Sequence, residues 1–248
     1  MTLHWLAPDW PVPASVHALS TWRVGGVSVG RYAALNLGDH VDDEPAAVAA
    51  NRRALREAAR LPAEPVWLRQ VHGTRVADLD GAEGDARMAP EADAAVTRRP
   101  GRVCAILTAD CLPVLFAADG GEAVGAAHAG WRGLAAGVLE ATVRALGVPP
   151  ARLAAWIGPG ISARHYEVGA EVREALLRAD PDAQAAFEPS ASGRFLADLP
   201  ALARRRLEAQ GVGRVYASPD CTYADANHFF SHRREAPCGR QASLIWLG

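Results

Sequence analysis

The chain has 248 residues, half of them apolar, and its 26 basic and 28 acidic residues give a formal net charge of −2 at pH 7. This composition is typical of a globular protein, and the lack of a basic block excludes nucleic acid as the main partner. Every basic residue is arginine, which also excludes chemistry that depends on a lysine Schiff base or a P-loop lysine.

The N-terminal stretch shows no export signal, because prolines and Asp9 interrupt its apolar residues and no basic segment precedes them. No apolar run reaches the ~20 residues of a membrane span. The four cysteines are widely spaced and form no C-x-x-C pair, so we expect free thiols rather than disulfides. We therefore expect a cytoplasmic protein that does not act at a membrane.

The first hundred or so residues predict short strands and one helix. We expect strands over 15–23, 66–71, 74–79 and 92–97. A helix is predicted over 45–60, where Pro45 follows three acidic residues and apolar positions recur at helical spacing. The polar, glycine-containing stretch 81–91 is predicted to be an exposed loop. Asp93 lies inside the apolar stretch 92–97 and reads as a buried acid.

The most informative stretch lies in the middle of the chain. Apolar runs over 103–107, 112–118 and 123–127 predict three buried strands. Cys111 lies between the first two runs and His128 directly follows the third, so both are expected at strand ends, where a rigid scaffold holds reactive side chains against a cleft. A helix is predicted from Gly130 to about residue 146, ended by Gly147 and the prolines beyond it.

The remaining chain predicts strands over 153–157, 215–217 and 243–247 and helices over 168–179 and 199–210. Short strands alternate with helices, and neighbouring strands are joined by tight turns. This pattern favours the α/β class, with residues 1–248 forming a single domain and a mixed β-sheet flanked by helices in α/β/α layers.

His72, Cys111 and His128 all follow apolar stretches and form a plausible set of three zinc ligands. Three protein ligands leave one coordination position for water, which is the arrangement of catalytic zinc. The same residues would also serve as a cysteine nucleophile with a histidine base. Their spacing matches no short metal motif, so the residues alone leave both readings open beside ordinary hydrogen-bonded histidines and a buried thiol.

Other polar residues are candidates for the same site. Asp110 would orient a histidine or the substrate, or simply end the strand in a turn. Arg132 lies at a predicted helix start, where free N–H groups favour an anion such as phosphate. His165 is expected to be a structural or a surface residue. The candidate substrate or phosphate contacts are Arg23, Asn36, Arg132, Arg233 and Arg240.

Several motifs in order along the chain resemble the YfiH family, the group labelled laccase domain or purine nucleoside phosphorylase. The motifs that carry the resemblance are LRQVHG (68–73), ADAAVT (92–97), TADCLPVLF (108–116), AHAGWRG (127–133), DCTY (220–223) and FSHRR (230–234). The match extends from about residue 21 to the C-terminus. The chain departs from the family at Gly160, where a cysteine is frequent, and at Cys238, near a usual threonine or serine.

The resemblance implies a single α/β domain with a mixed sheet between helices, and a zinc ion held by His72, Cys111 and His128. It also implies phosphorolysis of adenosine, inosine and methylthioadenosine, together with adenosine deamination. The expected partners are therefore purine nucleosides and phosphate, and the expected state is a monomer or small homo-oligomer.

Two other readings remain open. One is a copper-dependent polyphenol oxidase (laccase), with copper as the alternative metal; the eight histidines include no His-x-His pair, which a multicopper site commonly uses. The other is a cysteine hydrolase or amidase that edits a peptidoglycan precursor.

Overall fold

A six-stranded mixed sheet forms one half of the core in this computed structural model, which describes residues 2–81 and 89–248. In spatial order its strands are β12 (Arg214–Ala217), β8 (Leu153–Ile157), β6 (Leu112–Ala118), β7 (Val124–Ala129), β4 (Ala94–Thr97) and β3 (Val76–Asp78). The outer pairs β12–β8 and β4–β3 are parallel, and the central neighbours are antiparallel. Every residue of β6 and β7 is buried, which is why their sequences read as continuous apolar runs.

A four-stranded antiparallel sheet packs against one face of the six-stranded sheet. Its strands, in spatial order, are β1 (Trp5–Leu6), β2 (Val16–Thr21), β13 (Gln241–Leu247) and β5 (Val103–Thr108). Between the two sheets lies a shared apolar core in which Ile106 and Ile245 from one sheet meet Leu115 and Trp156 from the other. Burial of this kind supplies the main driving force for folding.

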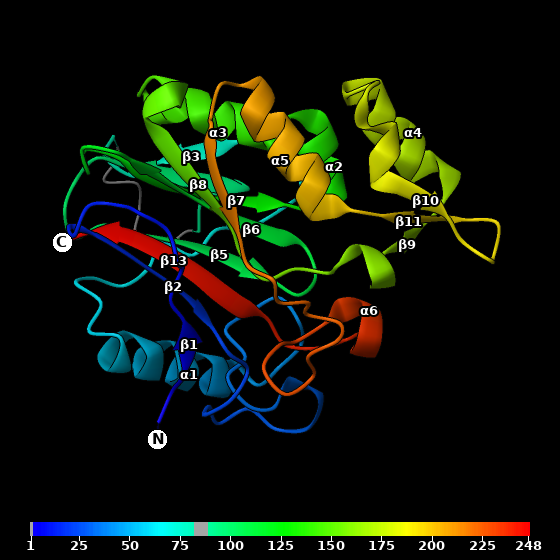
Figure 1. Ribbon diagram of the computed structural model, residues 1–248. Coiled ribbons are helices and arrows are strands. Elements are labelled where there is room, and N and C mark those ends of the chain that lie inside the picture. Colours follow the sequence, from blue (N-terminus) through cyan, green and yellow to red (C-terminus); the bar gives the residue numbers. More distant parts are fainter. Residues whose placement is uncertain (1, 82–88) are drawn as a thin grey trace.

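Helices cover the outer faces of both sheets, so the molecule has four layers (Figure 1). Helix α1 (Pro45–Ala58) covers the four-stranded sheet, and its Leu55 packs in a cluster with side chains of β5 and β13. On the opposite side, α2 (Trp131–Ala136), α3 (Val138–Leu146) and α5 (Leu199–Ala209) cover the six-stranded sheet. The predicted α/β class with a mixed sheet is confirmed, with one more sheet layer than expected.

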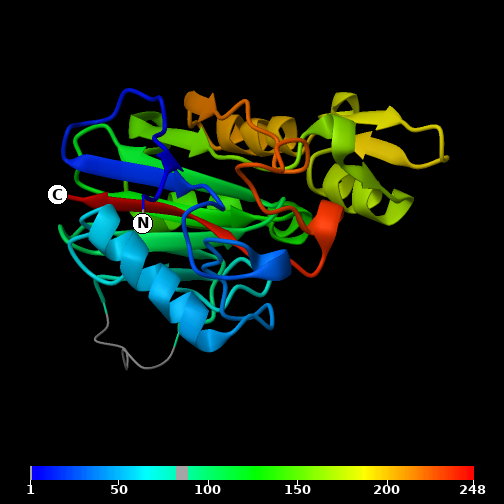
Figure 2. The same ribbon diagram turned by 90° about the horizontal axis from the view of Figure 1, so that it is seen from below.

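A small subassembly projects from one end of the molecule (Figures 1 and 2). It contains α4 (Ala170–Ala179) and a three-stranded antiparallel sheet of β10 (Phe187–Pro189), β11 (Phe195–Ala197) and β9 (Glu167–Val168). The short helix α6 (His232–Glu235) lies nearby. The sequence predicted α4 but not these strands, because two or three residues are too few for a periodic pattern.

Two expected elements differ in the structure. The stretch 66–71 was wrongly predicted as a strand: only single bridges form, from Val66 to Cys104 and from Arg69 to Glu91. Directly after the second bridge, the side chain of Gln70 accepts from the backbone N–H of Leu107 and donates to its C=O, in place of a strand ladder. The helix predicted from residue 130 to about 146 is divided into α2 and α3 by residue 137, a glycine with φ 99°.

The expected loop 81–91 falls largely on residues 82–88, which lie outside the described part of the chain. Within the described residues, no helix combines the length and the apolar character needed to cross a membrane.

Candidate metal centre

Cys111 lies where the chain passes from one large sheet to the other. β5 belongs to the four-stranded sheet and β6 to the six-stranded sheet, and only residues 109–111 separate them. In this crossing Asp110 has φ 94°, which is rare for a residue with a side chain. Its Oδ1 accepts a hydrogen bond from the Thr222 hydroxyl, and its Oδ2 accepts one from the backbone N–H of Arg233, each at 2.7 Å. These bonds hold the strained turn and so fix the position of the thiol.

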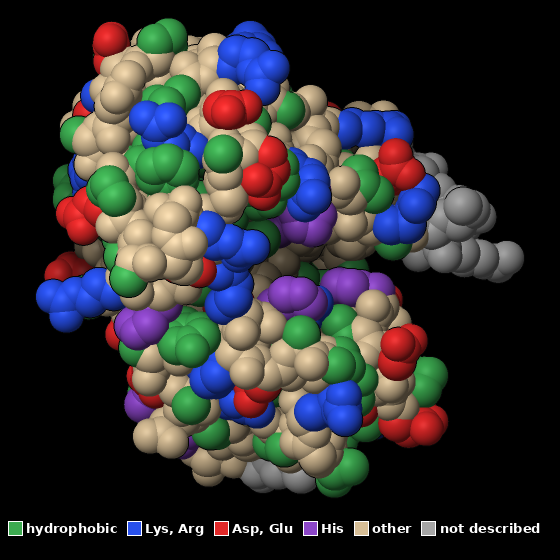
Figure 3. All heavy atoms as spheres, turned by 90° about the vertical axis from the view of Figure 1, so that its right-hand side faces the viewer, with side chains coloured by type: hydrophobic (Ala, Val, Ile, Leu, Met, Phe, Trp, Pro, Cys, Tyr) green, Lys and Arg blue, Asp and Glu red, His purple; other side chains and the backbone are tan. Residues whose placement is uncertain are grey.

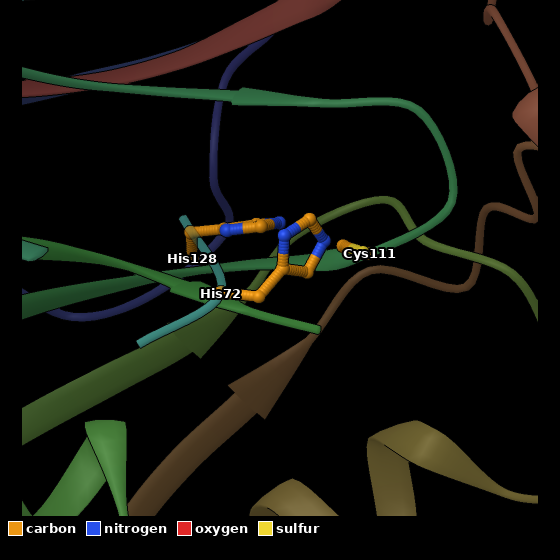
Figure 4. Close-up of side chains that lie close together, drawn as sticks. All are labelled: His72, Cys111 and His128. Atoms are coloured by element: carbon orange, nitrogen blue, oxygen red, sulfur yellow. The ribbon is translucent and has the colours of Figure 1, made fainter. Parts of the chain in front are cut away.

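The three predicted ligands converge at this crossing. One ligand atom from each of His72, Cys111 and His128 lies within 4.8 Å of the others, and the two imidazole rings meet edge to face with centroids 4.7 Å apart. Figure 4 shows the three side chains pointing toward one another. His128 is buried and His72 is exposed, so the centre opens to solvent on the His72 side. In residues 2–81 and 89–248, this is the sole cluster of three or more such side chains close enough to hold a metal.

Asp93 connects both histidines, although the sequence analysis gave it no role in the site. Its fully buried carboxylate lies 2.9 Å from Nδ1 of His128. It also accepts the backbone N–H groups of Val71, His72 and Gly73 at 3.1, 2.9 and 2.7 Å. These contacts hold His72 at φ 61° and leave Nε2 of His128 free for a metal. An acid inside an apolar strand was the available signal, because a buried carboxylate needs partners.

The charges of Cys111 and His128 depend on each other. Burial alone would raise the pKa of Cys111, but the adjacent His128 charge and the nearness of His72 outweigh it and lower the pKa to about 6. Burial would lower the pKa of His128, but the Cys111 thiolate and Asp93 raise it to about 9. Without a metal, the pair is therefore a thiolate beside an imidazolium between these pH values. A metal would displace the imidazolium proton, since ligands bind deprotonated.

Gly130 leaves open space beside two of the candidate ligands. A Cβ atom at this position would lie 2.9 Å from Sγ of Cys111 and 3.0 Å from Cδ2 of His72. Any side chain here would therefore press on the thiol and the ring. Two imidazoles and one thiolate around an open space fit a zinc ion, and the same donor types also accept copper.

Tyr166 links the metal centre to two of the predicted phosphate contacts. Burial is the main reason that the pKa of Tyr166 is raised; the charges of Cys111 and Asp110 add to this, and those of Arg233 and Arg132 oppose it. The guanidinium of Arg233 lies 5.2 Å from the Tyr166 ring centroid. The charges of the thiolate, the acid and both arginines thus all act on the tyrosine. No role was predicted for Tyr166 from the sequence.

Arg132 and Arg233 both have exposed side chains. The guanidinium of Arg132 lies over the Trp131 ring, 4.4 Å from its centroid. Arg233 donates from Nη1 to the Glu167 carbonyl at 2.8 Å, which leaves other donors of its guanidinium for an anion. Their predicted contact with phosphate stays a prediction.

The other three predicted contacts are bonded to the protein itself. Arg23 forms an ion pair with Glu235 at 2.7 Å. Asn36 is fully buried and accepts the backbone N–H of Arg240 at 2.9 Å. The Arg240 guanidinium donates to the carbonyl oxygens of residues 238 and 239. Their role toward substrate also stays a prediction, but these polar atoms connect distant segments of the fold.

The face that carries α6 and the small subassembly is hollowed across its middle (Figure 3). Histidine and arginine side chains gather around this hollow. Positive side chains beside a concave surface favour an anionic ligand.

The protein is thus an α/β protein in which two packed sheets lie between helices, with a candidate metal site of two histidines and one cysteine where the sheets meet. The chain belongs to the family described as multi-copper polyphenol oxidoreductase laccase, whose model matches residues 17–248.

Curated relatives cover almost the whole chain. A protein of Pseudomonas aeruginosa named purine nucleoside phosphorylase is 54% identical over 244 residues, which is 98% of both chains. The Escherichia coli protein named purine nucleoside phosphorylase YfiH is 49% identical over 242 residues, again 98% of both.

Solved structures with the same fold also match almost the whole chain. A Neisseria meningitidis protein has a TM-score of 0.93 at 50% identity, covering 98% of each chain. YlmD from Geobacillus stearothermophilus has a TM-score of 0.90 at 32% identity, covering 98% of this chain and 96% of the other.

Proposed function

We propose that this protein is a zinc-dependent purine nucleoside phosphorylase of the cytoplasm, with residues 1–248 acting as one catalytic domain. Its substrates would be adenosine, inosine and S-methyl-5'-thioadenosine, and its products the free base and ribose 1-phosphate or its methylthio form. The observation that carries the proposal is the gathering of His72, Cys111 and His128 within 4.8 Å in a chain whose relatives are named purine nucleoside phosphorylases. The adenosine deaminase activity rests on the family resemblance alone.

The proposed metal site uses each ligand in the form that zinc requires. Cys111 would bind as the thiolate that its lowered pKa already favours, and His128 would bind through Nε2 because Asp93 holds Nδ1. His72 would be the third ligand, on the exposed side. When bound, zinc would supply a Lewis acid at this centre.

In the proposed phosphorolysis, a phosphate oxygen attacks C1′ of the nucleoside, the bond from C1′ to the base nitrogen breaks, and the base leaves with that electron pair and gains a proton. Arg132 and Arg233 would hold the phosphate and balance its negative charge. Tyr166 stays protonated because its pKa is raised, so its hydroxyl would donate a hydrogen bond to the bound anion. Asp110 acts through the residues it holds, since it fixes both the Cys111 turn and the backbone of Arg233.

A second candidate function is a metal-free cysteine hydrolase or amidase, the reading in which Cys111 is the nucleophile. It is favoured by the lowered pKa of Cys111 and by the His128 imidazole beside it. The copper oxidase reading has the family description in its favour, but the single three-residue cluster in the described residues would hold one ion rather than several.

The test is base release from inosine and adenosine by protein of defined metal content. Zinc-loaded protein should release base only with phosphate present, and chelation should stop the reaction until zinc is returned. Base release that survives chelation would contradict the zinc requirement, and no base release by zinc-loaded protein would leave the cysteine hydrolase and the oxidase as the remaining readings.

A further inference from the structure

A second thiol–imidazole pair lies outside the metal centre, in a cavity of about 490 Å³. The cavity is lined by the loop that follows β8, through Gly158 and Gly160, and by the loop that follows β12, from Ser218 to Cys221. β8 and β12 are parallel neighbours. Open α/β sheets place ligands outside the carboxyl ends of parallel strands, and this volume is typical of small-molecule sites.

Two polar groups contact the thiol of Cys221, a backbone N–H and an imidazole. Its Sγ accepts a hydrogen bond from the backbone N–H of Ser162 at 3.3 Å and lies 3.6 Å from Nδ1 of His165. The imidazole is itself fixed, because Nδ1 lies 3.2 Å from the Ser162 hydroxyl and the ring stacks on Tyr223 with centroids 4.7 Å apart. A donor and a base beside a thiol are the surroundings of reactive cysteines.

The other thiols of the chain are either buried or part of the metal centre. All four cysteines are free. Cys104 and Cys238 are fully buried, and burial raises the pKa of each. Cys111 belongs to the metal centre. Cys221 is partly exposed and faces the cavity, so it is the thiol that an outside reagent reaches while zinc covers Cys111.

The cavity also carries charges of both signs. Arg164 precedes His165 in its wall, Asp220 precedes Cys221, and Asp198 also lines the cavity. A ligand with both a carboxylate and an ammonium group matches such a lining. Amino acid and small peptide thiols have this chemistry.

We propose that Cys221 is a modification site that exchanges with low-molecular-weight disulfides bearing both a carboxylate and an ammonium group. His165 takes the proton of the Cys221 thiol, and the thiolate attacks one sulfur of the disulfide. The old S–S bond breaks, a bond from Cys221 to that sulfur forms, and the other half leaves as a thiolate that gains the proton. Cys221 is oxidised and the departing half is reduced, so no further oxidant is required.

The test uses zinc-loaded, full-length protein and oxidised glutathione, with adducts located by peptide mass. We expect one reversible adduct, on Cys221, forming several-fold faster than with bis(2-hydroxyethyl) disulfide, which is uncharged. Cys221→Ser should remove the adduct, and His165→Asn should slow its formation several-fold. Cys238→Ser is the matched control and should change neither.

Three results would overturn the proposal: no adduct on Cys221 in the wild-type protein, equal rates with the charged and uncharged disulfides, or a wild-type rate in a folded His165→Asn variant. Since the first two measurements need no variant, the test holds even if a substitution destabilises the fold. Neither measurement depends on nucleoside turnover, so the outcome is independent of the proposed phosphorylase activity.

Discussion

The Asp93 carboxylate lies 2.9 Å from Nδ1 of His128 and also accepts the backbone N–H of His72 at 2.9 Å. One buried acid thus fixes the ring of one candidate ligand and the main chain of another. A carboxylate behind a ligating histidine sets the orientation and basicity of the ring. The geometry of the centre therefore depends on Asp93 as well as on the three ligands.

Replacing Asp93 by asparagine should weaken zinc binding about 10–100-fold, the usual cost of losing such a partner. The amide keeps the volume but loses the charge and one acceptor oxygen. Zinc affinity would be measured by competition with a chelating dye. Asp225→Asn is the matched control, because Asp225 pairs with Nδ1 of His228 at 2.6 Å outside the cluster. Equal affinity in the wild-type and Asp93→Asn proteins would refute this role.

Cys111→Ala should lose most of the zinc that the wild-type protein holds, which we expect to be close to one ion per chain. The variant lacks the thiolate, the donor that binds zinc most strongly in this set. Metal content would be measured on protein made without added copper, with Cys104→Ala as the control. Full zinc occupancy in Cys111→Ala would remove this residue from the ligand set.

Gly130→Ala should also reduce metal binding, since the new methyl group would lie 2.9 Å from Sγ of Cys111 and 3.0 Å from the His72 ring. Gly213→Ala is the control because a Cβ there meets no atom within 4 Å. The readouts are zinc affinity and thermal unfolding. A Gly130→Ala protein with wild-type affinity would show that the space beside Gly130 is not needed by the metal.

The pH dependence of Cys111 alkylation should report the thiolate–imidazolium pair. In chelated wild-type protein the labelling rate should rise with a midpoint near pH 6, the lowered pKa of Cys111. His128→Ala removes the positive charge, so in chelated protein the midpoint should move up. With zinc supplied, the metal covers the wild-type thiol. Cys111 should then be labelled faster in His128→Ala than in the wild-type protein. Buried Cys104 and Cys238 serve as internal controls, and slower labelling of the variant under zinc would contradict the zinc-ligand assignment.

The same pair also sets how the stability of the metal-free protein responds to pH. Because the pKa of His128 is raised on folding, protonated His128 stabilises the folded state. This stabilisation is fully present below pH 6.5, the unfolded pKa, and is lost as the pH rises through about 9. Because the pKa of Cys111 is lowered on folding, its thiolate also stabilises the folded state. This stabilisation is fully present above pH 9.0, the unfolded pKa, and is lost as the pH falls through about 6. The two contributions offset each other, because the folded and the unfolded pair hold the same number of protons between about pH 6.5 and 9. Urea unfolding of the metal-free protein should therefore show only a weak pH dependence from this pair, and a steep change in stability across this range that is absent from Cys111→Ala would argue against the ion pair.

Arg132→Ala and Arg233→Ala should each raise the KM for phosphate about 10–100-fold, since hydrogen bonds to charged groups are worth ~1.5–3 kcal/mol. Deamination, which uses water, should change much less. Arg240→Ala is the comparison: its guanidinium donates to backbone carbonyls, so we expect a lower melting temperature without a selective change in KM. Equal loss of both activities in all three variants would assign them to the fold or to nucleoside binding.

The central strands and the positions of Cys111 and His128 could be predicted because buried strands leave continuous apolar runs. The division into two sheets could not, since such a run looks the same in either sheet. The role of Asp93 was missed because its partner lies 35 residues away. Arg240 and Asn36 were predicted as substrate contacts. The structure shows that they also hydrogen-bond to each other, although 204 residues separate them in the sequence, and residue types alone do not reveal such a pairing.

The measurement closest to the central claim is release of hypoxanthine from inosine by zinc-loaded protein, with and without phosphate, followed by detection of ribose 1-phosphate. We expect base and ribose 1-phosphate in equal amounts, no reaction without phosphate, and loss of activity in Cys111→Ala. Base release at the same rate without phosphate, or no release by protein carrying one zinc ion per chain, would contradict the proposed phosphorylase.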